Sequence, residues 1–206
     1  MPKKTFTRLN DKKKGIIIEG AIKAFNKQPY DKVTVADIVK HCHIPRGSFY
    51  QYFQDKFDLF MYLLLTIQKK KMAYLEPALK RVGKDPFLDL YMEMFEAGFN
   101  FADDYPALSK IGYHLYFSQD PDVKKIMQQL EENGVKIIQS LLEKDQRAGH
   151  TRPEVDMEIV AIILYRINAR DVLDQYYKGV SRVDIYAYVN KYLEIIRKGI
   201  EIEVTQ

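Results

Sequence analysis

The chain has 206 residues, 47% of them hydrophobic, which is enough for a core in one domain or in two small ones. A net charge of +4 is too small to argue from, and a single cysteine excludes an internal disulfide. The longest apolar run, residues 59–67, is far shorter than the roughly 20 residues of a membrane span, and the basic residues 1–14 contain no secretory signal. We therefore expect a soluble, cytoplasmic protein with no membrane partner.

Basic residues are concentrated at the start of the chain. Residues 1–60 hold 12 Lys and Arg against 6 Asp and Glu, whereas the remainder holds 20 against 22. A local surplus of this kind is the expected electrostatic signature of a nucleic-acid binder. Lys3, Lys4, Arg8 and residues 12–14 suit a flexible arm that seeks phosphates, although such a run is more often a solvated terminus.

The first predicted helix covers about residues 10–27. Its apolar residues at helical spacing are Ile18, Ala21, Ile22 and Phe25. Asn10 or Asp11 is placed to cap its first turn. We expect this helix to cover the apolar sides of the two short helices that follow.

Those two helices lie between Val33 and Lys56. Thr34 precedes an apolar series and Asp37 follows three residues later, which predicts a helix that begins with a capping-box arrangement. Pro45 disfavours helical geometry at the residue before it and suits the first turn of a new helix. One helix thus ends and another begins within about four residues, which is helix-turn-helix spacing.

The second helix of the pair is predicted from about Pro45 to Phe53. Phe49 and Phe53 fall on one side, and Gly47 falls on the other, where the missing side chain lets another backbone come close. Candidates for contacts with base edges are Arg46 and Gln51, and candidates for phosphate contacts are Ser48, Tyr50 and Lys56. The same pattern is also found in ordinary packed surface helices.

The segment resembles the signature of the TetR (tetracycline-repressor) family of bacterial transcription regulators. The matching elements are Thr34-Val35, Ile38-Val39, the turn Cys42-His43-Ile44, Gly47-Ser48-Phe49-Tyr50, Tyr52-Phe53 and Lys56. The resemblance implies that the DNA-binding residues are Thr34, Pro45, Arg46, Gly47, Ser48, Tyr50, Gln51, Tyr52 and Lys56. It covers about residues 16–60 by motif and the rest only by length and helical pattern.

Two departures from the family pattern concern turns. His43 stands where the family usually has Gly, and the Gly usual after the first helix is replaced around Gln28-Pro29. Histidine tolerates a left-handed backbone better than most residues, so the turn is expected to form.

The rest of the chain shows helical periodicity and no strand alternation. Helices are expected over about residues 55–80, 86–104, 106–117, 121–148, 154–178 and 182–203. The sequence therefore predicts an all-α fold with a helix-turn-helix DNA-binding domain of three helices, residues 1–54, and a larger helical domain, residues 55–206. The resemblance implies that the larger domain binds an effector and dimerises, and that the helix after residue 55 transmits changes to the DNA-binding domain.

Two further sets of residues are assigned by the resemblance. An apolar cavity for a hydrophobic or aromatic effector would be lined by Phe95, Phe99, Tyr113, Phe117 and Tyr165, with His114, Arg166 and Asn168 as orienting polar groups. A homodimer interface of two C-terminal helices from each subunit would include Ile185, Tyr188, Val189, Tyr192, Leu193 and Ile196. Plain core packing explains either pattern as well.

No enzyme signature is visible. The four histidines are scattered, and no zinc motif, nucleophile elbow or Gly-rich phosphate loop is present, so we expect no catalytic residue, metal site or cofactor. The sequence predicts a ligand-responsive repressor that binds a palindromic DNA operator as a homodimer. The alternative is a helical carrier or sensor of hydrophobic small molecules whose N-terminal bundle binds a protein.

Overall fold

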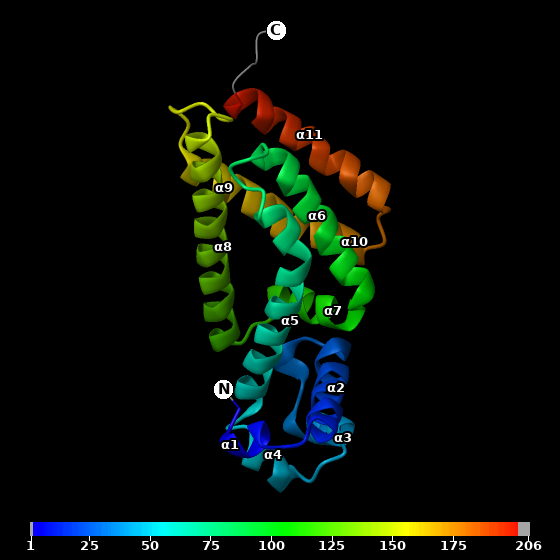
Figure 1. The fold of residues 1–206 in the computed structure, drawn as a ribbon. Helices are drawn as coiled ribbons and strands as arrows, with labels where there is room; N and C mark the ends of the chain where they lie inside the picture. Colours follow the sequence, from blue (N-terminus) through cyan, green and yellow to red (C-terminus); the bar gives the residue numbers. More distant parts are fainter. Residues whose placement is uncertain (1, 202–206) are drawn as a thin grey trace. The chain divides into compact units, whose positions relative to one another are not determined.

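A computed structural model describes residues 2–201, apart from the side chains of residues 168–170. Over this range the secondary structure is helical, with two isolated bridges and no strand, which confirms the predicted all-α class (Figure 1). The predicted Asn168 side chain lies outside the described residues.

The helices of the first half of the chain are α1 Lys4–Thr7, α2 Asp11–Lys27, the 3-10 turn η1 Tyr30–Lys32, α3 Val35–Cys42, α4 Arg46–Tyr52, α5 Lys56–Leu79 and α6 Phe87–Asp104. Those of the second half are α7 Pro106–His114, the 3-10 turn η2 Leu115–Phe117, α8 Pro121–Arg147, α9 Met157–Arg166, the π-helical segment η3 Ile167–Val172, α10 Leu173–Tyr177 and α11 Arg182–Ile200. The predicted helix over residues 154–178 therefore contains a π-helical interruption.

The helix ends follow from local side chains. The Asn10 side chain accepts a hydrogen bond from the Lys13 amide at 2.9 Å and so caps α2. Ser181 caps α11 in the same way by accepting from the Asp184 amide at 3.1 Å. Gly149 follows α8 with a φ of 83°, a left-handed conformation that ends a helix with least strain when the residue is glycine.

The chain divides into two compact units. The N-terminal unit contains the residues up to Tyr74 together with Gly98–Lys125, and the C-terminal unit contains Leu75–Ala97 together with the residues from Ile126 on. Three helices, α5, α6 and α8, belong partly to each unit. The domain boundary after residue 54 stays a prediction, because these units group the chain by packing and not by function.

The N-terminal unit is built around α2, α3 and α4. Its core includes fully buried Ile38, Phe49 and Phe53. At Gly20 of α2, an added Cβ would lie 2.6 Å from backbone atoms of His41 and Cys42, so the backbones of α2 and α3 touch here. Only glycine fits this crossing, a requirement that the periodicity of α2 did not reveal.

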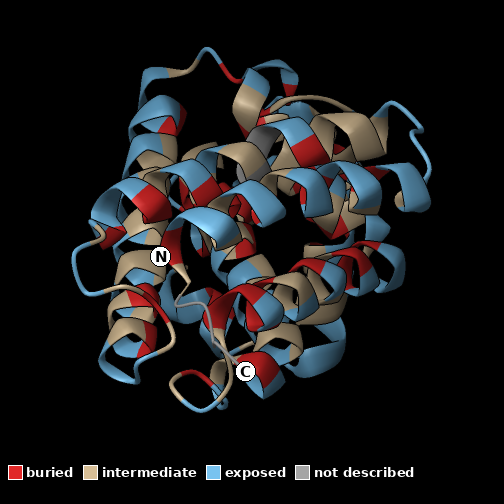
Figure 2. Cartoon of the chain, turned by 90° about the horizontal axis from the view of Figure 1, so that it is seen from above, coloured by how far each residue is buried: buried red, intermediate tan, exposed pale blue. Residues whose placement is uncertain are grey.

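The C-terminal unit combines an apolar core with buried polar contacts. Leu164, Ile185 and Val189 are fully buried. The carboxylate of Asp145, which is 1% exposed, accepts a hydrogen bond from the Phe87 amide at 2.9 Å and lies 2.8 Å from Nδ1 of His150. Asp145 of α8 thus satisfies an amide at the first turn of α6. Buried and exposed residues alternate along the helices, as amphipathic helices require (Figure 2).

Candidate nucleic-acid interface

The turn between α3 and α4 has the geometry that the sequence predicted. His43 adopts φ 53° and ψ 41°, and it is the one residue other than glycine with a positive φ in residues 2–201. The His43 amide bonds back to the Val39 carbonyl oxygen, which ends α3, and Pro45 is the extended residue before α4. Histidine therefore fills the position where glycine is usual.

The start of α3 is fixed by the predicted capping box. The Thr34 hydroxyl accepts from the Asp37 amide at 3.1 Å, and the Asp37 carboxylate accepts from the Thr34 amide at 3.0 Å and the Thr34 hydroxyl at 2.6 Å. These bonds from the hydroxyl and amide of Thr34 lower the pKa of Asp37 below its ordinary value. Thr34 itself remains exposed.

One side of α4 is anchored in the core. Phe49 and Phe53 are completely buried, with ring centroids 5.7 Å apart, and Phe6 of α1 packs on Phe53 at 4.9 Å. This buried aromatic cluster holds the short helix in one orientation. The opposite side is therefore presented by a rigid support.

That opposite side is exposed and polar. Arg46, Gly47, Tyr50 and Gln51 are exposed, and Ser48 is half-buried. The Arg46 guanidinium lies 6.0 Å from the Tyr50 ring centroid, so the two side chains lie side by side. A Cβ added at Gly47 would meet nothing within 4 Å, so packing within this chain does not explain the glycine.

Two predicted DNA-binding residues have other roles in the structure. Tyr52 is 6% exposed and packs edge-on against Phe6, because it falls on the buried side of α4. The Lys56 ammonium donates to the Tyr30 carbonyl oxygen at 2.9 Å and lies 3.9 Å from the Tyr30 ring centroid. Both side chains stabilise the protein's own fold in this arrangement, and contacts of Tyr52 and Lys56 with DNA stay a prediction.

The N-terminal segment is also more ordered than a flexible arm. Lys3 donates from its amide to the Tyr52 carbonyl oxygen at 2.8 Å and from its ammonium to the Tyr50 carbonyl oxygen at 2.7 Å. The Thr5 hydroxyl donates to the Gln51 carbonyl oxygen. These donors satisfy the last carbonyl groups of α4. The prediction of a flexible arm is therefore corrected for Lys3, which is bonded to the end of α4, while Lys4 is the first residue of α1.

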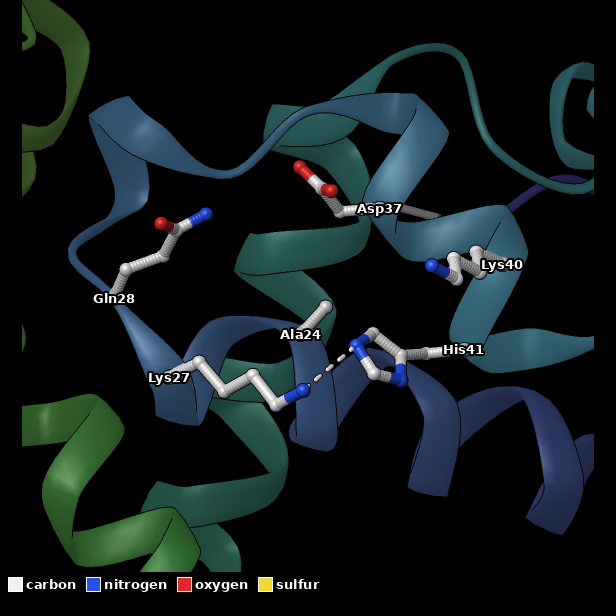
Figure 3. A pocket seen from close by; sticks show the side chains of 6 residues that line it. All are labelled: Ala24, Lys27, Gln28, Asp37, Lys40 and His41. Atoms are coloured by element: carbon white, nitrogen blue, oxygen red, sulfur yellow. Dashed lines mark hydrogen bonds between the residues drawn. The ribbon is translucent and has the colours of Figure 1, made fainter.

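A pocket of about 420 Å³ opens elsewhere on the N-terminal unit, between α2 and α3 (Figure 3). It is lined by Ala24, Lys27, Gln28, Asp37, Lys40 and His41. The Lys27 ammonium lies 3.5 Å from Nε2 of His41. Partial burial and the neighbouring ammonium groups of Lys27 and Lys40 lower the pKa of His41, so its imidazole is neutral at pH 7. None of these residues was a predicted site residue.

The residues predicted to line an effector cavity fall in both units. In the N-terminal unit, Phe99 is buried, whereas Phe117 is 45% exposed and packs edge-on against Tyr113 at 4.9 Å. Nδ1 of His114 lies 3.3 Å from the Phe25 carbonyl oxygen, so α7 is bonded to α2. His114 therefore already has a partner within the protein.

In the C-terminal unit, Phe95 is buried and packs edge-on against Tyr186 at 5.5 Å. Burial raises the pKa of Tyr165, whose ring occupies the space left by the missing side chain of Gly134. Arg166 pairs with Glu131 at 3.1 Å on the surface, and its role as an orienting group for an effector stays a prediction.

The predicted dimer residues of α11 separate into two groups. Ile185, Val189 and Leu193 are at most 3% exposed, so their side chains pack within their own chain and are not available to a second copy. Tyr188 is exposed, whereas Tyr192 and Ile196 are half-buried. The buried residues of α11 therefore form part of the core of the C-terminal unit.

Exposed apolar side chains lie on α9 and α11, and of the four named here Tyr188 alone was a predicted dimer residue. Ile159 and Ile163 on α9 are 57% and 40% exposed, and Tyr188 and Ile195 on α11 are 42% and 73% exposed. Residues four or seven apart share a helix face, so each helix carries an exposed apolar face of its own. Periodicity alone did not separate these faces from core.

We also searched residues 2–201 for metal sites, a reactive cysteine and membrane-spanning helices. No group of His, Cys, Asp and Glu there is arranged to hold a metal ion. Cys42 is buried, which raises the pKa of its thiol to about 12, and the thiol donates to the Ile17 carbonyl oxygen at 3.2 Å. No helix in the described part of the chain has the length and apolar character to cross a membrane.

Residues 17–63, which contain α3, the turn and α4, match the family model described as bacterial regulatory proteins, tetR family. The chain is 28% identical over 147 residues to the uncharacterized HTH-type transcriptional regulator YdgC of Bacillus subtilis, covering 70% of this chain and 71% of that protein. It is 26% identical over 152 residues to the probable acrEF/envCD operon repressor of Escherichia coli, covering 72% and 69%.

Solved structures give the same fold. The complex of SmeT with triclosan superimposes with a TM-score of 0.74 at 16% identity, covering 94% of each chain. At this identity the likeness concerns the fold alone.

Proposed function

Since this chain belongs to the TetR family of bacterial regulatory proteins, we propose that it is a transcriptional repressor that binds a palindromic operator as a homodimer and releases it when a small molecule binds. The observation that carries the proposal is the outer side of α4. Exposed Arg46, Tyr50 and Gln51 surround a glycine that no packing within the chain requires, on a helix whose other side is locked in the core.

Each exposed residue has a role that fits its chemistry. Arg46 and Gln51 carry the planar donor and acceptor groups that pair with guanine and adenine edges in the major groove. Thr34, Ser48 and Tyr50 offer hydroxyl groups to phosphates, and Pro45 and Gly47 let the backbone approach the DNA. Thr34 reaches a phosphate only if its hydroxyl leaves the Asp37 carboxylate or shares its hydrogen bonding with it.

The second copy is proposed to dock through the exposed faces of α9 and α11. Ile159, Ile163, Tyr188 and Ile195 together expose apolar surface that a single chain leaves in water. A two-helix face from each copy forms a four-helix interface, in which Tyr192 and Ile196 would lie at the edge. Two copies would present two α4 helices about 34–36 Å apart, in successive major grooves.

The effector is proposed to be a hydrophobic or aromatic small molecule. Within the C-terminal unit Phe95 and Tyr165, and within the N-terminal unit Phe99 and Tyr113, remain candidates for contacts with it. The SmeT structure with triclosan supports the idea that this fold holds small molecules. The name of the Escherichia coli relative, an operon repressor, supports repression over activation. A protein that acts on operators works in the cytoplasm.

Selection from a pool of random duplexes tests the proposal. The expected result is enrichment of an inverted repeat, with fluorescence anisotropy showing binding that weakens steeply as salt rises. Selection without enrichment, and equal affinity for random duplexes, would overturn the proposal and favour a carrier or sensor whose N-terminal bundle binds a protein.

A further inference from the structure

The η1 turn connects the starts of two long helices in the N-terminal unit. Lys56, at the first residue of α5, donates to the Tyr30 carbonyl oxygen at 2.9 Å. The next residue, Asp31, accepts hydrogen bonds from the Ser118 hydroxyl at 2.8 Å, the Gln119 amide at 2.8 Å and the Asp120 amide at 3.0 Å. Residues 118–120 lead directly into α8.

Three donors on one carboxylate make this a strong contact, because hydrogen bonds to a charged acceptor are stronger than neutral ones. Burial alone would raise the pKa of Asp31, but the bonds from Gln119, Ser118 and Asp120, together with the Lys56 ammonium, hold it below its ordinary value. Asp31 is therefore ionised at neutral pH. Ser118 is 3% exposed, so Asp31 is also the acceptor that its buried hydroxyl needs.

The turn that Asp31 holds is itself the cap of α8. The Asp120 carboxylate accepts from the Asp122 amide at 3.0 Å and the Val123 amide at 3.2 Å, which fixes the first turn of the helix. From there α8 continues to Arg147. Any displacement along α8 that reaches its first turn therefore acts on Asp31.

We propose that Asp31 is a positioning residue that connects α3 and α4, here called the DNA-reading helices, to the first turn of α8. The reading helices then have two connections to the rest of the chain. One is covalent, through α5, and the other is the set of hydrogen bonds on Asp31, to which the bond between α7 and α2 at His114 adds. In a homodimer, this second connection fixes the direction of α4 and so the half-site spacing that the dimer accepts. This consequence for spacing rests on the proposed function.

The first test needs no DNA. Hydrogen exchange of the intact protein measures the protection of the Gln119 and Asp120 amides. Asp31→Ala is expected to remove the protection of the Gln119 amide and to reduce that of the Asp120 amide, which also donates to the Ser118 hydroxyl at 3.3 Å. Ser118→Ala is expected to reduce protection less, because both amides keep their bonds to Asp31. The control is Asp11→Ala, which removes a carboxylate that is fully exposed. Unchanged protection in Asp31→Ala would overturn the contact. If Asp31→Ala does not fold, Ser118→Ala with Asp31→Asn decides the same point.

The second test compares operators. Anisotropy measures the affinity for the selected operator, for the same half-sites with one base pair added or removed between them, and for a single half-site. Asp31→Ala is expected to lower the discrimination between spacings about tenfold, within the usual range of coupling between sites, and to leave single half-site affinity unchanged. Asp31→Asn, which keeps an acceptor oxygen, is expected to restore part of the discrimination.

Two outcomes separate this inference from the proposed function. Sequence-specific binding in which Asp31→Ala keeps the wild-type discrimination, or loses affinity for every DNA equally, would overturn the positioning role alone. Wild-type protein without any sequence preference would overturn the proposed function and the spacing role together, while the exchange result still decides the contact.

Discussion

The outer faces of α4 and of the α9 and α11 helices differ in the partner they suit. The α4 face exposes Arg46, Tyr50 and Gln51 beside a bare glycine, whereas the other face exposes Ile159 and Ile195. Charged and amide groups gain from phosphates and base edges, while exposed aliphatic groups gain only from being removed from water. We therefore propose that one chain carries a surface for nucleic acid and a separate surface for its own copy, so that a substitution can disrupt either one alone.

The largest effect is expected inside the N-terminal unit, at the crossing of α2 and α3. Gly20→Ala places a Cβ 2.6 Å from the Cys42 backbone, which cannot move aside as a side chain would. We expect a loss of about 3 kcal/mol in the free energy of unfolding, at the upper end for an overpacked site. Urea denaturation measures it.

Gly15→Ala in the same helix is the matched control. Its Cβ would meet nothing within 4 Å, so the substitution is expected to stabilise by about 0.5–1 kcal/mol through helix propensity. Equal effects of the two substitutions would show that the close crossing does not matter.

In the C-terminal unit, the position expected to be most sensitive to substitution is the buried carboxylate of Asp145. Asp145→Ala leaves the Phe87 amide without its acceptor in a buried place, and the expected loss is about 2–3 kcal/mol by urea denaturation. Glu132→Ala, an exposed position on the same helix, should stay within about 0.5 kcal/mol of wild type. A loss no larger than that of the control would show that the hydrogen bond to Asp145 does not stabilise this unit.

The apolar face is tested by charge. Ile195→Asp is expected to raise the dissociation constant of the homodimer at least about tenfold, because dimerisation would bury an unpaired carboxylate. Val183→Asp is the control, since Val183 is 77% exposed but points to a different side of α11. Sedimentation velocity reports both, and equal weakening by the two variants would place the interface elsewhere.

The α4 face is tested by base preference. Gln51→Ala is expected to reduce discrimination at one operator position by about 1–3 kcal/mol, the range for a bidentate contact, while other positions keep their preference. Gln54→Ala, an exposed glutamine beyond the helix, should change nothing. Anisotropy with single-base operator variants measures this, and a uniform loss over all of them would make Gln51 a phosphate contact instead.

The smallest effect concerns pH. Bonds from the hydroxyl and amide of Thr34 lower the pKa of Asp37 from its ordinary 3.8, so the carboxylate stabilises the fold above that pH. This contribution is lost as pH falls below 3.8 through the lowered folded-state pKa. Thr34→Ala is expected to cost about 1 kcal/mol at pH 7 and less at pH 3, by urea denaturation. A loss that is the same at both pH values would contradict it.

The sequence predicted best where structure is set by neighbouring residues. The capping box at Thr34, the turn at His43 and Pro45, and the cap at Asn10 all act over a few positions, and all were visible as residue types at fixed spacing. The all-α fold followed from the same signals repeated along the chain.

The remainder depends on contacts between distant residues. Asp31 meets residues 118–120 only after folding, and no local pattern marks an aspartate that accepts from an amide 88 positions away. The need for glycine at position 20 comes from the close approach of the α2 and α3 backbones, which the apolar periodicity of α2 does not show. On α11, three of the six predicted dimer residues proved to be core of the same unit, because a sequence pattern does not say whether the neighbour belongs to the same chain.

Hydroxyl-radical footprinting of the selected operator tests the central claim most directly, because it reports sequence-specific contact and twofold arrangement together. Two protected segments are expected, with their centres about 10 base pairs, or a small multiple of that, apart. Protection is expected to disappear at both in Arg46→Ala combined with Gln51→Ala, and to weaken equally at both at low concentration in Ile195→Asp, because a single copy binds either half-site with the same affinity. A single protected segment in the wild type, or protection that survives the loss of Arg46 and Gln51, would contradict it.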